Sequence, residues 1–306
     1  MDMLPRAALH LILLLLCAPL LQGVIVRTKA LFAGRTGAPL LQPYFDLARL
    51  LRKGCVFSRT TTWVFLTGPV VGVAVPVLAA LFMPFGALPA PLAFTGDLLL
   101  FVYLFGVARF FTVASALDTG SSFEGMGGAR EVTFSCLAEP TVLFCLIVLA
   151  TVSGDLSLTT LLGPHLAEAW QGPAGLSLGL VLVCLFVVLL VENSRIPFDD
   201  PNTHLELTMI HEVMVLDHSG PPFALVLYGA ALKLMVLGAP VVRLLLPVTT
   251  GSWFGDTLLF LAGMLLLAVL IGTVESIMAR LRLVRIPQVL VGTTLLAGFA
   301  LVLVLR

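Results

Sequence analysis

Residues 175–192 read GLSLGLVLVCLFVVLLVE, an apolar run whose only charged residue is the glutamate at its end. A helix needs about 20 mostly apolar residues to cross the hydrocarbon core of a bilayer. This run therefore predicts a membrane-spanning helix. By the same criterion eight stretches are predicted to span the membrane, at about 8–26, 62–83, 94–114, 132–153, 175–192, 223–246, 254–275 and 286–305.

The composition of the whole chain agrees with this prediction. Of its 306 residues, 59% are hydrophobic and 11% are charged, and the mean hydropathy is +1.09. A soluble domain needs about 25% charged residues to cover its surface. The sequence thus predicts an all-α polytopic integral membrane protein, with 1–306 as a single membrane domain and short amphipathic helices on the cytoplasmic side. The 17 Lys and Arg residues balance the 17 Asp and Glu residues, so charge gives no reason to expect a nucleic acid as partner.

The cysteines do not predict a metal site. A zinc or iron–sulfur site would show closely spaced cysteines, such as a Cys-x-x-Cys pair. The five cysteines are scattered instead, at Cys17, Cys55, Cys136, Cys145 and Cys184. The pair His211-Glu212 could open the zinc-binding pattern His-Glu-x-x-His, but the last position is Val215. We therefore expect no metal bound by this chain.

The first apolar stretch could instead be a cleaved secretory signal. Only Arg6 precedes it, whereas Arg27, Lys29 and Arg35 follow it, which is the reverse of the charge placement in a signal. We therefore predict that this stretch remains in the protein as a helix.

Positive residues predict the orientation, because Lys and Arg concentrate in the cytoplasmic connections. The connections around 84–93, 154–174 and 247–253 contain neither residue. Those on the other side contain Arg27, Lys29, Arg35, Arg49, Arg52, Lys53, Arg59, Arg130, Arg195, Arg280, Arg282 and Arg285. We expect a protein of the cell inner membrane with both termini on the outer side.

Two of the polar connections flank the early spans. In the first, Gln42, Asp46, Arg49 and Lys53 share one stripe of a helix whose other side is apolar. This pattern predicts a helix along the membrane surface, for which a simple anchor is the plain explanation. The second, 121–131, has several glycines that permit tight turns, and its Arg130 can balance a neighbouring carboxylate.

Glu139 lies about two turns into the apolar run 132–153. A carboxylate at that depth is costly, so it is expected to face protein or water and to act in a proton relay. The alternative is a structural pair with a Lys or Arg from another helix. Lys233, about a third of the way into 223–246, should pair with a carboxylate or lose its proton, unless it snorkels to the surface.

The third polar connection, 192–220, is the richest in titratable groups. Asp200 and Pro201 are good residues for a helix start, which predicts a helix to about Leu216. On it His204, Thr208 and His211 share a face, with Glu212 beside them. Such groups can pass protons near pH 7, although a polar helix that docks a soluble partner would also explain them.

These connections, in this order, resemble the complex I subunit 1 family over nearly the whole chain. The resemblance is carried by Leu41-Gln42-Pro43 with Asp46 and Lys53, by Gly128-Ala129-Arg130-Glu131, and by Glu192 with Arg195-Ile196-Pro197-Phe198-Asp199. Residues 200–212, DPNTHLELTMIHE, are similar to the hydrogenase branch of that family, to which formate hydrogenlyase and energy-converting nickel–iron hydrogenase membrane subunits belong. The quinone branch usually has a Glu-Tyr pair in this region, where this chain has His211-Glu212-Val213-Met214.

The resemblance implies a non-catalytic membrane subunit whose cytoplasmic loops meet hydrogenase-like large and small subunits, with antiporter-like subunits beside it in the bilayer. It places the nickel–iron centre and the iron–sulfur clusters in those partners and implies no cofactor in this chain; the missing Glu-Tyr pair speaks against a quinone. A proton or ion relay would contain Glu124, Glu131, Glu139, Glu192, Asp199, Glu206, His211, Glu212 and Lys233. The junction would contain Gln42, Asp46, Arg130, Arg195 and His204.

We therefore expect the anchor and proton- or ion-coupling subunit of an energy-converting nickel–iron hydrogenase-type complex. One alternative is the quinone-site subunit of a complex I-like NADH–quinone oxidoreductase. The other is a free-standing secondary transporter, which would predict internal repeats; none is evident in the sequence.

Overall fold

The computed structural model describes residues 3–86, 88–199 and 209–306, and within these ranges it contains helices and no β-strand. The helices are α1 (Met3–Phe32), α2 (Gln42–Leu51), α3 (Trp63–Ala80), α4 (Asp97–Asp118), α5 (Ser122–Ser153), α6 (Leu158–Leu161), α7 (Leu166–Gln171), α8 (Gly175–Glu192), α9 (His211–Met214), α10 (Gly220–Leu245), α11 (Trp253–Ile277), the 3-10 helix η1 (Leu283–Arg285) and α12 (Ile286–Val304).

Eight helical segments of the described chain are long and apolar enough to cross a membrane. They are Ala7–Phe32, Trp63–Ala80, Asp97–Asp118, Ser122–Ser153, Gly175–Glu192, Gly220–Leu245, Trp253–Ile277 and Leu283–Val304. Each overlaps one of the eight predicted stretches, so the prediction of an all-α polytopic membrane protein is confirmed.

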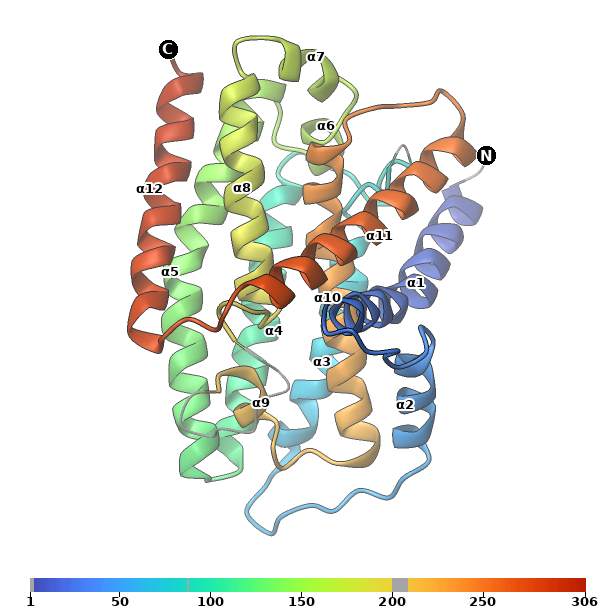
Figure 1. Ribbon diagram of the computed structural model, residues 1–306, viewed down its shortest axis with the longest axis vertical. Coiled ribbons are helices and arrows are strands. Elements are labelled where there is room, and N and C mark those ends of the chain that lie inside the picture. Colours follow the sequence, from blue (N-terminus) through green and yellow to red (C-terminus); the bar gives the residue numbers. More distant parts are fainter. Residues whose placement is uncertain (1–2, 87, 200–208) are drawn as a thin grey trace.

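Six of the long helices form two packed groups, which meet where α4 packs on α5 and α10 packs on α8. Helices α5, α8 and α12 pack on one another, whereas α3 packs between α4 and α10. Helices α1 and α11 pack together and run obliquely to the others in Figure 1. Pro19 lies inside α1, which changes direction along its length in Figure 1, as expected where proline removes a backbone donor.

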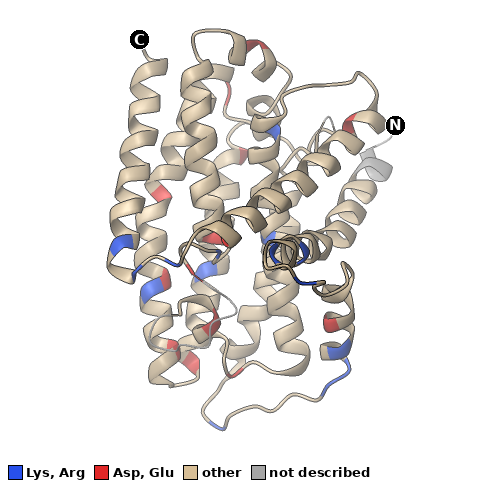
Figure 2. Cartoon of the chain, in the orientation of Figure 1, with Lys and Arg blue, Asp and Glu red and all other residues tan. Residues whose placement is uncertain are grey.

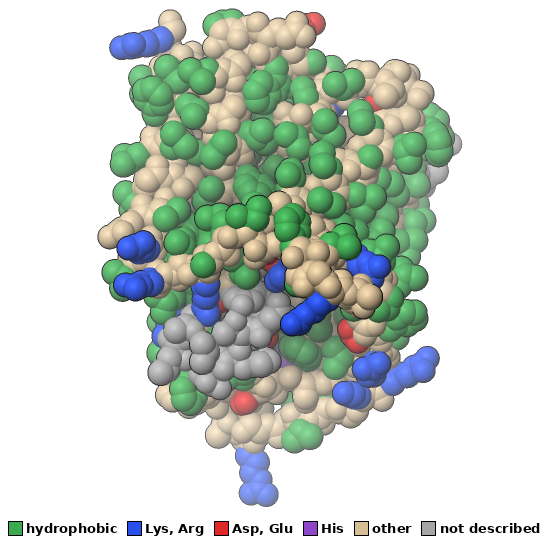
Figure 3. All heavy atoms as spheres, in the orientation of Figure 1, with side chains coloured by type: hydrophobic (Ala, Val, Ile, Leu, Met, Phe, Trp, Pro, Cys, Tyr) green, Lys and Arg blue, Asp and Glu red, His purple; other side chains and the backbone are tan. Residues whose placement is uncertain are grey.

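The two ends of the bundle differ in charge. We call them the α9 end, which also holds α2 and the 52–62 connection, and the α6–α7 end, toward which α1 begins and α12 finishes (Figure 1). Most charged side chains lie in the half toward the α9 end (Figure 2). On the face drawn in Figure 3, hydrophobic side chains cover the other half, and most Lys and Arg side chains gather toward the α9 end.

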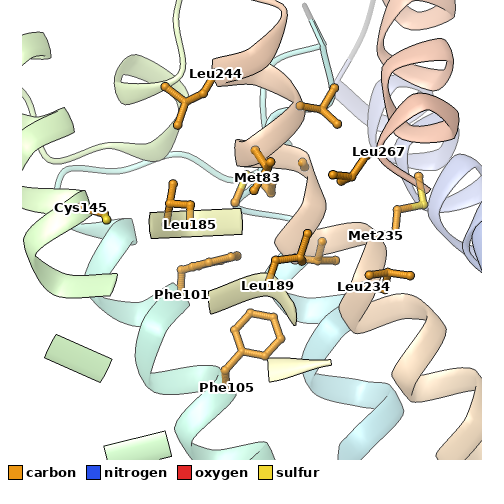
Figure 4. Close-up of a cluster of buried hydrophobic side chains, with 14 of the residues drawn as sticks. Met83, Phe101, Phe105, Cys145, Leu185, Leu189, Leu234, Met235, Leu244 and Leu267 are labelled. Carbon is orange, nitrogen blue, oxygen red and sulfur yellow. The ribbon is translucent and has the colours of Figure 1, made fainter. Parts of the chain in front are cut away.

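The apolar half is tightly packed by large side chains from several helices. Figure 4 shows Phe101, Leu185 and Leu189 from α4 and α8 pointing toward Met83 and α10. Met83, Leu189 and Met235 are each at most 1% exposed. A small apolar cavity of about 50 Å³ lies beside these residues and is lined almost wholly by hydrocarbon. Because empty cavities of this kind stay dry, this half of the bundle separates its polar half from the α6–α7 end.

The glycine-rich segment 121–131 was expected to form tight turns, and this expectation is wrong. The segment is the first part of α5, which runs unbroken from Ser122 to Ser153. Its Gly127 lies against α9, because a Cβ atom there would be 2.3 Å from Val213 Cγ1 and 3.0 Å from the Ile210 carbonyl oxygen. This glycine therefore permits a close approach between two elements and makes no turn.

The helix predicted from Asp200 to about Leu216 is also corrected. Residues 200–208, which include the predicted site residues His204 and Glu206, lie outside the described residues. Between Met209 and Leu216 only α9, His211–Met214, is helical, and 215–217 form turns. The surface helix predicted around Gln42 is present as α2, which has no buried residue, and Lys53 lies beyond its end.

Candidate functional site

Four charged side chains from four different helices form a continuous chain of ion pairs. Arg109 of α4 donates from Nη1 to Oε1 of Glu139 on α5, over 2.6 Å. Its Nη2 donates to Oε1 of Glu192 on α8, also over 2.6 Å. Lys233 of α10 donates from Nζ to the second oxygen of Glu192, over 2.8 Å. We call Glu139, Arg109, Glu192 and Lys233 the Arg109 network.

The pairing explains how these charges can lie inside membrane-spanning helices. A charged side chain in a bilayer is costly unless it meets protein, water or an opposite charge. Two cations and two carboxylates alternate along the network, so the four charges balance. Lys233 therefore pairs with a carboxylate and does not snorkel, and Glu139 pairs with an arginine of another helix. This pairing does not test the predicted relay role of either residue.

Arg109 was not predicted as a site residue, whereas Glu192 was predicted as a member of the relay. In the structure Glu192 is the bridging carboxylate, and its side chain is 10% exposed. Arg109 could have been found by the rule that selected Glu139, because it lies inside the apolar run 94–114.

A cavity of about 100 Å³ lies beside the Arg109 network. Helices α3, α4 and α10 form much of its wall, and its charged or titratable lining comprises Arg109, Glu131, Glu192, His211, His218 and Lys233. A polar cavity of this size has room for several water molecules. The sequence-predicted residues Glu131, Glu192, His211 and Lys233 are thus brought together around one space.

Glu131 is the unpaired carboxylate of this cavity. Its carboxylate interacts electrostatically with Lys233 and Arg109 and is repelled by Glu192 and Asp199. No hydrogen bond or ion pair holds that carboxylate within the part of the chain that the structure describes, although its backbone oxygen accepts a bond from Ser135. A third carboxylate therefore faces a network whose four charges are already balanced.

Asp199 and Arg130 hold the backbone that leads into α9. Asp199 accepts hydrogen bonds from the amides of Ile210 and His211, over 3.1 Å and 3.0 Å, and forms a 2.8 Å ion pair with Arg280. Arg130 donates to the Met209 carbonyl oxygen over 2.8 Å. These two predicted site residues thus position His211 at the cavity. Its partly buried site lowers the pKa of His211, while nearby Glu212 opposes that shift.

Two further carboxylates occupy buried positions at the α9 end. Glu124 is 1% exposed and accepts a 3.2 Å hydrogen bond from the Asp217 amide. Glu275 of α11 has a side chain with 0% exposure and pairs with Lys29 of α1 and Arg195, over 2.8 Å and 3.4 Å. Glu275 was not predicted as a site residue, but it joins α1, α11 and the segment after α8.

The remaining predicted residues lie apart from the Arg109 network. Gln42 donates to Asp46 over 2.8 Å on α2. Both line a crevice of about 250 Å³ between α1, α2 and α10, which shares no lining residue with the cavity of Glu131. Glu212 lies on α9, half-buried. In the described ranges no group of three or more His, Cys, Asp and Glu side chains is placed to hold a metal; whether cofactors reside only in partners stays a prediction.

The sequence profile of the NADH dehydrogenase family matches residues 6–306. The chain belongs to the NADH dehydrogenase subunit 1 family. The resemblance found in the polar connections is thereby confirmed, and the match extends over all eight membrane-crossing segments.

Curated relatives of this family member come from two kinds of complex. Formate hydrogenlyase subunit 4 of Escherichia coli (strain K12) is 33% identical over 287 residues, covering 89% of each chain. Hydrogenase-4 component C of the same organism is 31% identical and covers 91% of this chain and 88% of its own. A subunit of the NADH-quinone oxidoreductase of Syntrophotalea carbinolica is 27% identical over 72% of this chain and 66% of its own.

A solved structure shares the fold. It is a chain of the membrane-bound sulfane sulfur reductase, an archaeal respiratory membrane complex, with a TM-score of 0.81 and 19% sequence identity. The alignment covers 99% of this chain and 100% of that chain. Homologues of the protein are therefore membrane subunits of hydrogenase-type and complex I-like complexes.

Proposed function

We propose that this protein is the membrane-anchor and proton- or ion-coupling subunit of an energy-converting nickel–iron hydrogenase-type complex. The two relatives above 30% identity are named as components of hydrogenase-type complexes. The observation that carries the coupling role is Glu131, an unpaired carboxylate that faces a water-sized cavity beside a balanced network of four charges. Glu131 can bind or lose a proton without breaking an ion pair. We therefore assign Glu131 as the residue that carries the proton beside the Arg109 network.

The path of the proton follows from the distribution of polar groups. The packed apolar half between this cavity and the α6–α7 end offers a proton no water. A proton at the Arg109 network leaves sideways instead, at Glu139, whose side chain is 47% exposed on the flank of the bundle. A neighbouring membrane subunit of the antiporter-like kind receives it there.

Peripheral redox subunits dock at the α9 end. This end carries most of the charged residues (Figure 2), and the positive connections face the cytoplasm of a cell inner membrane. Purification in mild detergent is expected to bring a hydrogenase-like subunit pair along. Recovery of a working transporter without partner subunits would contradict this proposal and support a free-standing transporter.

The coupling role is tested in sealed vesicles that contain the assembled complex. Glu131→Gln keeps the size of the side chain but removes its titration. Ion uptake should fall by about a hundredfold or more, the usual contribution of a positioned proton-transfer group, while hydrogen oxidation linked to a dye should persist. Glu168→Gln, at an exposed position of α7 at the other end, is the matched control and should change neither activity. If both activities of Glu131→Gln stay at the wild-type level, Glu131 is not the carrier.

A second candidate function is the quinone-site subunit of a complex I-like enzyme. The crevice of about 250 Å³ between α1, α2 and α10 supports it, because this crevice combines apolar residues with Gln42 and Asp46 at the membrane surface. The complex would then reduce a short-chain quinone, and Val26→Trp, which enlarges a side chain that lines the crevice, would abolish that reduction. A complex that reduces no quinone in the wild-type form eliminates this candidate.

A further inference from the structure

His218 is a buried histidine at the cavity of Glu131 that no step of the proposed relay uses. It lies just before α10 and is 7% exposed. Its ring stacks on Phe65 of α3, with centroids 4.0 Å apart and an interplanar angle of 21°. The ring is therefore held in place by an aromatic partner from another helix while it lines the cavity.

The hydrogen bonds around Ser115 decide which ring nitrogen carries the proton. Ser115 Oγ donates its single hydrogen to the Phe65 carbonyl oxygen over 2.8 Å. The same oxygen lies 3.5 Å from Nε2 of His218. Because the hydroxyl hydrogen already points to Phe65, we assign Nε2–H as the donor of this long contact, which leaves Nδ1 of the neutral ring as an acceptor.

Nδ1 of His218 is buried and has no hydrogen-bond partner in the described chain. Buried polar atoms without a protein partner are usually satisfied by water, and the cavity beside the ring is polar and large enough to hold it. An acceptor nitrogen that binds water in this cavity can exchange a proton with the other titratable side chains that contact the same water.

His218 directly follows Asp217 in the chain, at the surface of the α9 end. Asp217 is exposed, and its amide is bound by the buried carboxylate of Glu124 over 3.2 Å. On the other side the cavity leads to Glu131 and Lys233. The charged and titratable groups that face His218 from its own segment and across the cavity are Asp217, His211, Arg109, Glu131, Glu192 and Lys233.

We propose that His218 is a proton-transfer residue that joins the surface at Asp217 to the cavity of Glu131 through water bound at Nδ1. The neutral ring takes a proton from that water at Nδ1 and releases it from the same nitrogen to water on the Glu131 side, while Nε2–H stays toward Ser115. The ring ends as it began, so the step needs no oxidant or other co-reactant. This inference rests on the proposed coupling function. It adds the residue through which a proton from the surface enters the cavity.

The electrostatics of the site agree with a transient carrier. Burial lowers the pKa of His218, while the Phe65 carbonyl and Asp217 oppose that shift and His211 adds to it. The ring is therefore neutral at rest near pH 7 and holds a proton only briefly.

The test uses the assembled complex in sealed vesicles. His218→Gln keeps a donor toward Ser115 but cannot titrate, so proton uptake should fall by about a hundredfold or more while dye-linked hydrogen oxidation stays unchanged. In His218→Ala, imidazole in the buffer should restore part of the uptake, and pyrazole, a ring of the same shape but far weaker basicity, should not. His165→Gln, on a histidine near the α6–α7 end, is the matched control and should behave as wild type.

The outcomes separate this inference from the function on which it rests. If Glu131→Gln stops uptake and His218→Gln does not, His218 has no transfer role and the coupling function stands. If neither substitution affects uptake, both proposals fail. If the His218 variants do not assemble, Ser115→Ala provides the test, because it removes the partner of Nε2. A fall in the ratio of proton uptake to hydrogen oxidation, smaller than the fall expected for His218→Gln, supports the inference. An unchanged ratio overturns it.

Discussion

Arg109 organises the charges of the bundle because its guanidinium group can bind two carboxylates at once. Its two terminal nitrogens contact Glu139 and Glu192, which come from different helices. A lysine could not form this fork. Loss of one partner from a buried ion pair costs about 3–5 kcal/mol, because the other charge stays buried. For this reason Glu131, which has no such partner, is the better position at which to remove titration without breaking the fold.

At the same scale, His211 predicts a pH dependence for the segment around α9. Because its folded pKa lies below the usual 6.5, the locally unfolded segment binds more protons between these two values. The protection of this segment from proteolysis should be complete above about pH 6.5 and fall as the pH drops through that window. Limited proteolysis from about pH 8 to about pH 5.5 measures this. His211→Gln should flatten the profile, and protection that rises with acidity would contradict the assignment.

At the scale of the helices, the contact between α5 and α9 determines where His211 lies at the cavity of Glu131. Gly127 lets the Ile210 carbonyl and Val213 approach the helix backbone. Arg130, one turn further along α5, holds the Met209 carbonyl. The first turns of α5 thus fix the segment that presents His211 to the cavity. The glycines of this helix are tolerated because packing offsets their low helix propensity.

Two glycines of α5 give a matched pair of substitutions. Gly127→Ala places a Cβ atom 2.3 Å from Val213 Cγ1, so it should separate α5 from α9 at a cost of about 1–3 kcal/mol for overpacking. Gly125→Ala meets only Leu117 Cδ2 at 3.8 Å and should stabilise the helix by up to about 1 kcal/mol. Thermal unfolding in detergent compares the two variants. Equal behaviour would show that α5 and α9 are not in tight contact at Gly127.

At the scale of the whole molecule, the bundle is polar at one end and apolar at the other. The Arg109 network and its cavity lie in the polar half, and the tightly packed residues of Figure 4 lie in the other. Under the proposed function we therefore expect protons to enter this subunit from the α9 end. The asymmetry explains why the proposed function needs a neighbouring membrane subunit to complete transport across the bilayer.

The orientation of this asymmetric bundle is tested by labelling single cysteines in a background without the five native ones. Ser58→Cys and Thr249→Cys lie in exposed connections at opposite ends. Because Lys and Arg favour the cytoplasmic side, a membrane-impermeant thiol reagent added from outside should label Thr249→Cys and leave Ser58→Cys unlabelled. The reverse pattern would invert the predicted topology.

By itself, the sequence determined the eight membrane-crossing helices and the family, and it pointed to Glu131, His211, Glu192 and Lys233. These follow from local patterns, because hydropathy and short motifs are properties of consecutive residues. The tertiary structure alone decided that Arg109 bridges partners 30 and 83 residues away along the chain, that Gly127 serves a helix contact, and that His218 lines the cavity of Glu131. Ion pairs and cavities depend on where helices cross, and this packing is set by side chains that are remote from one another in the sequence.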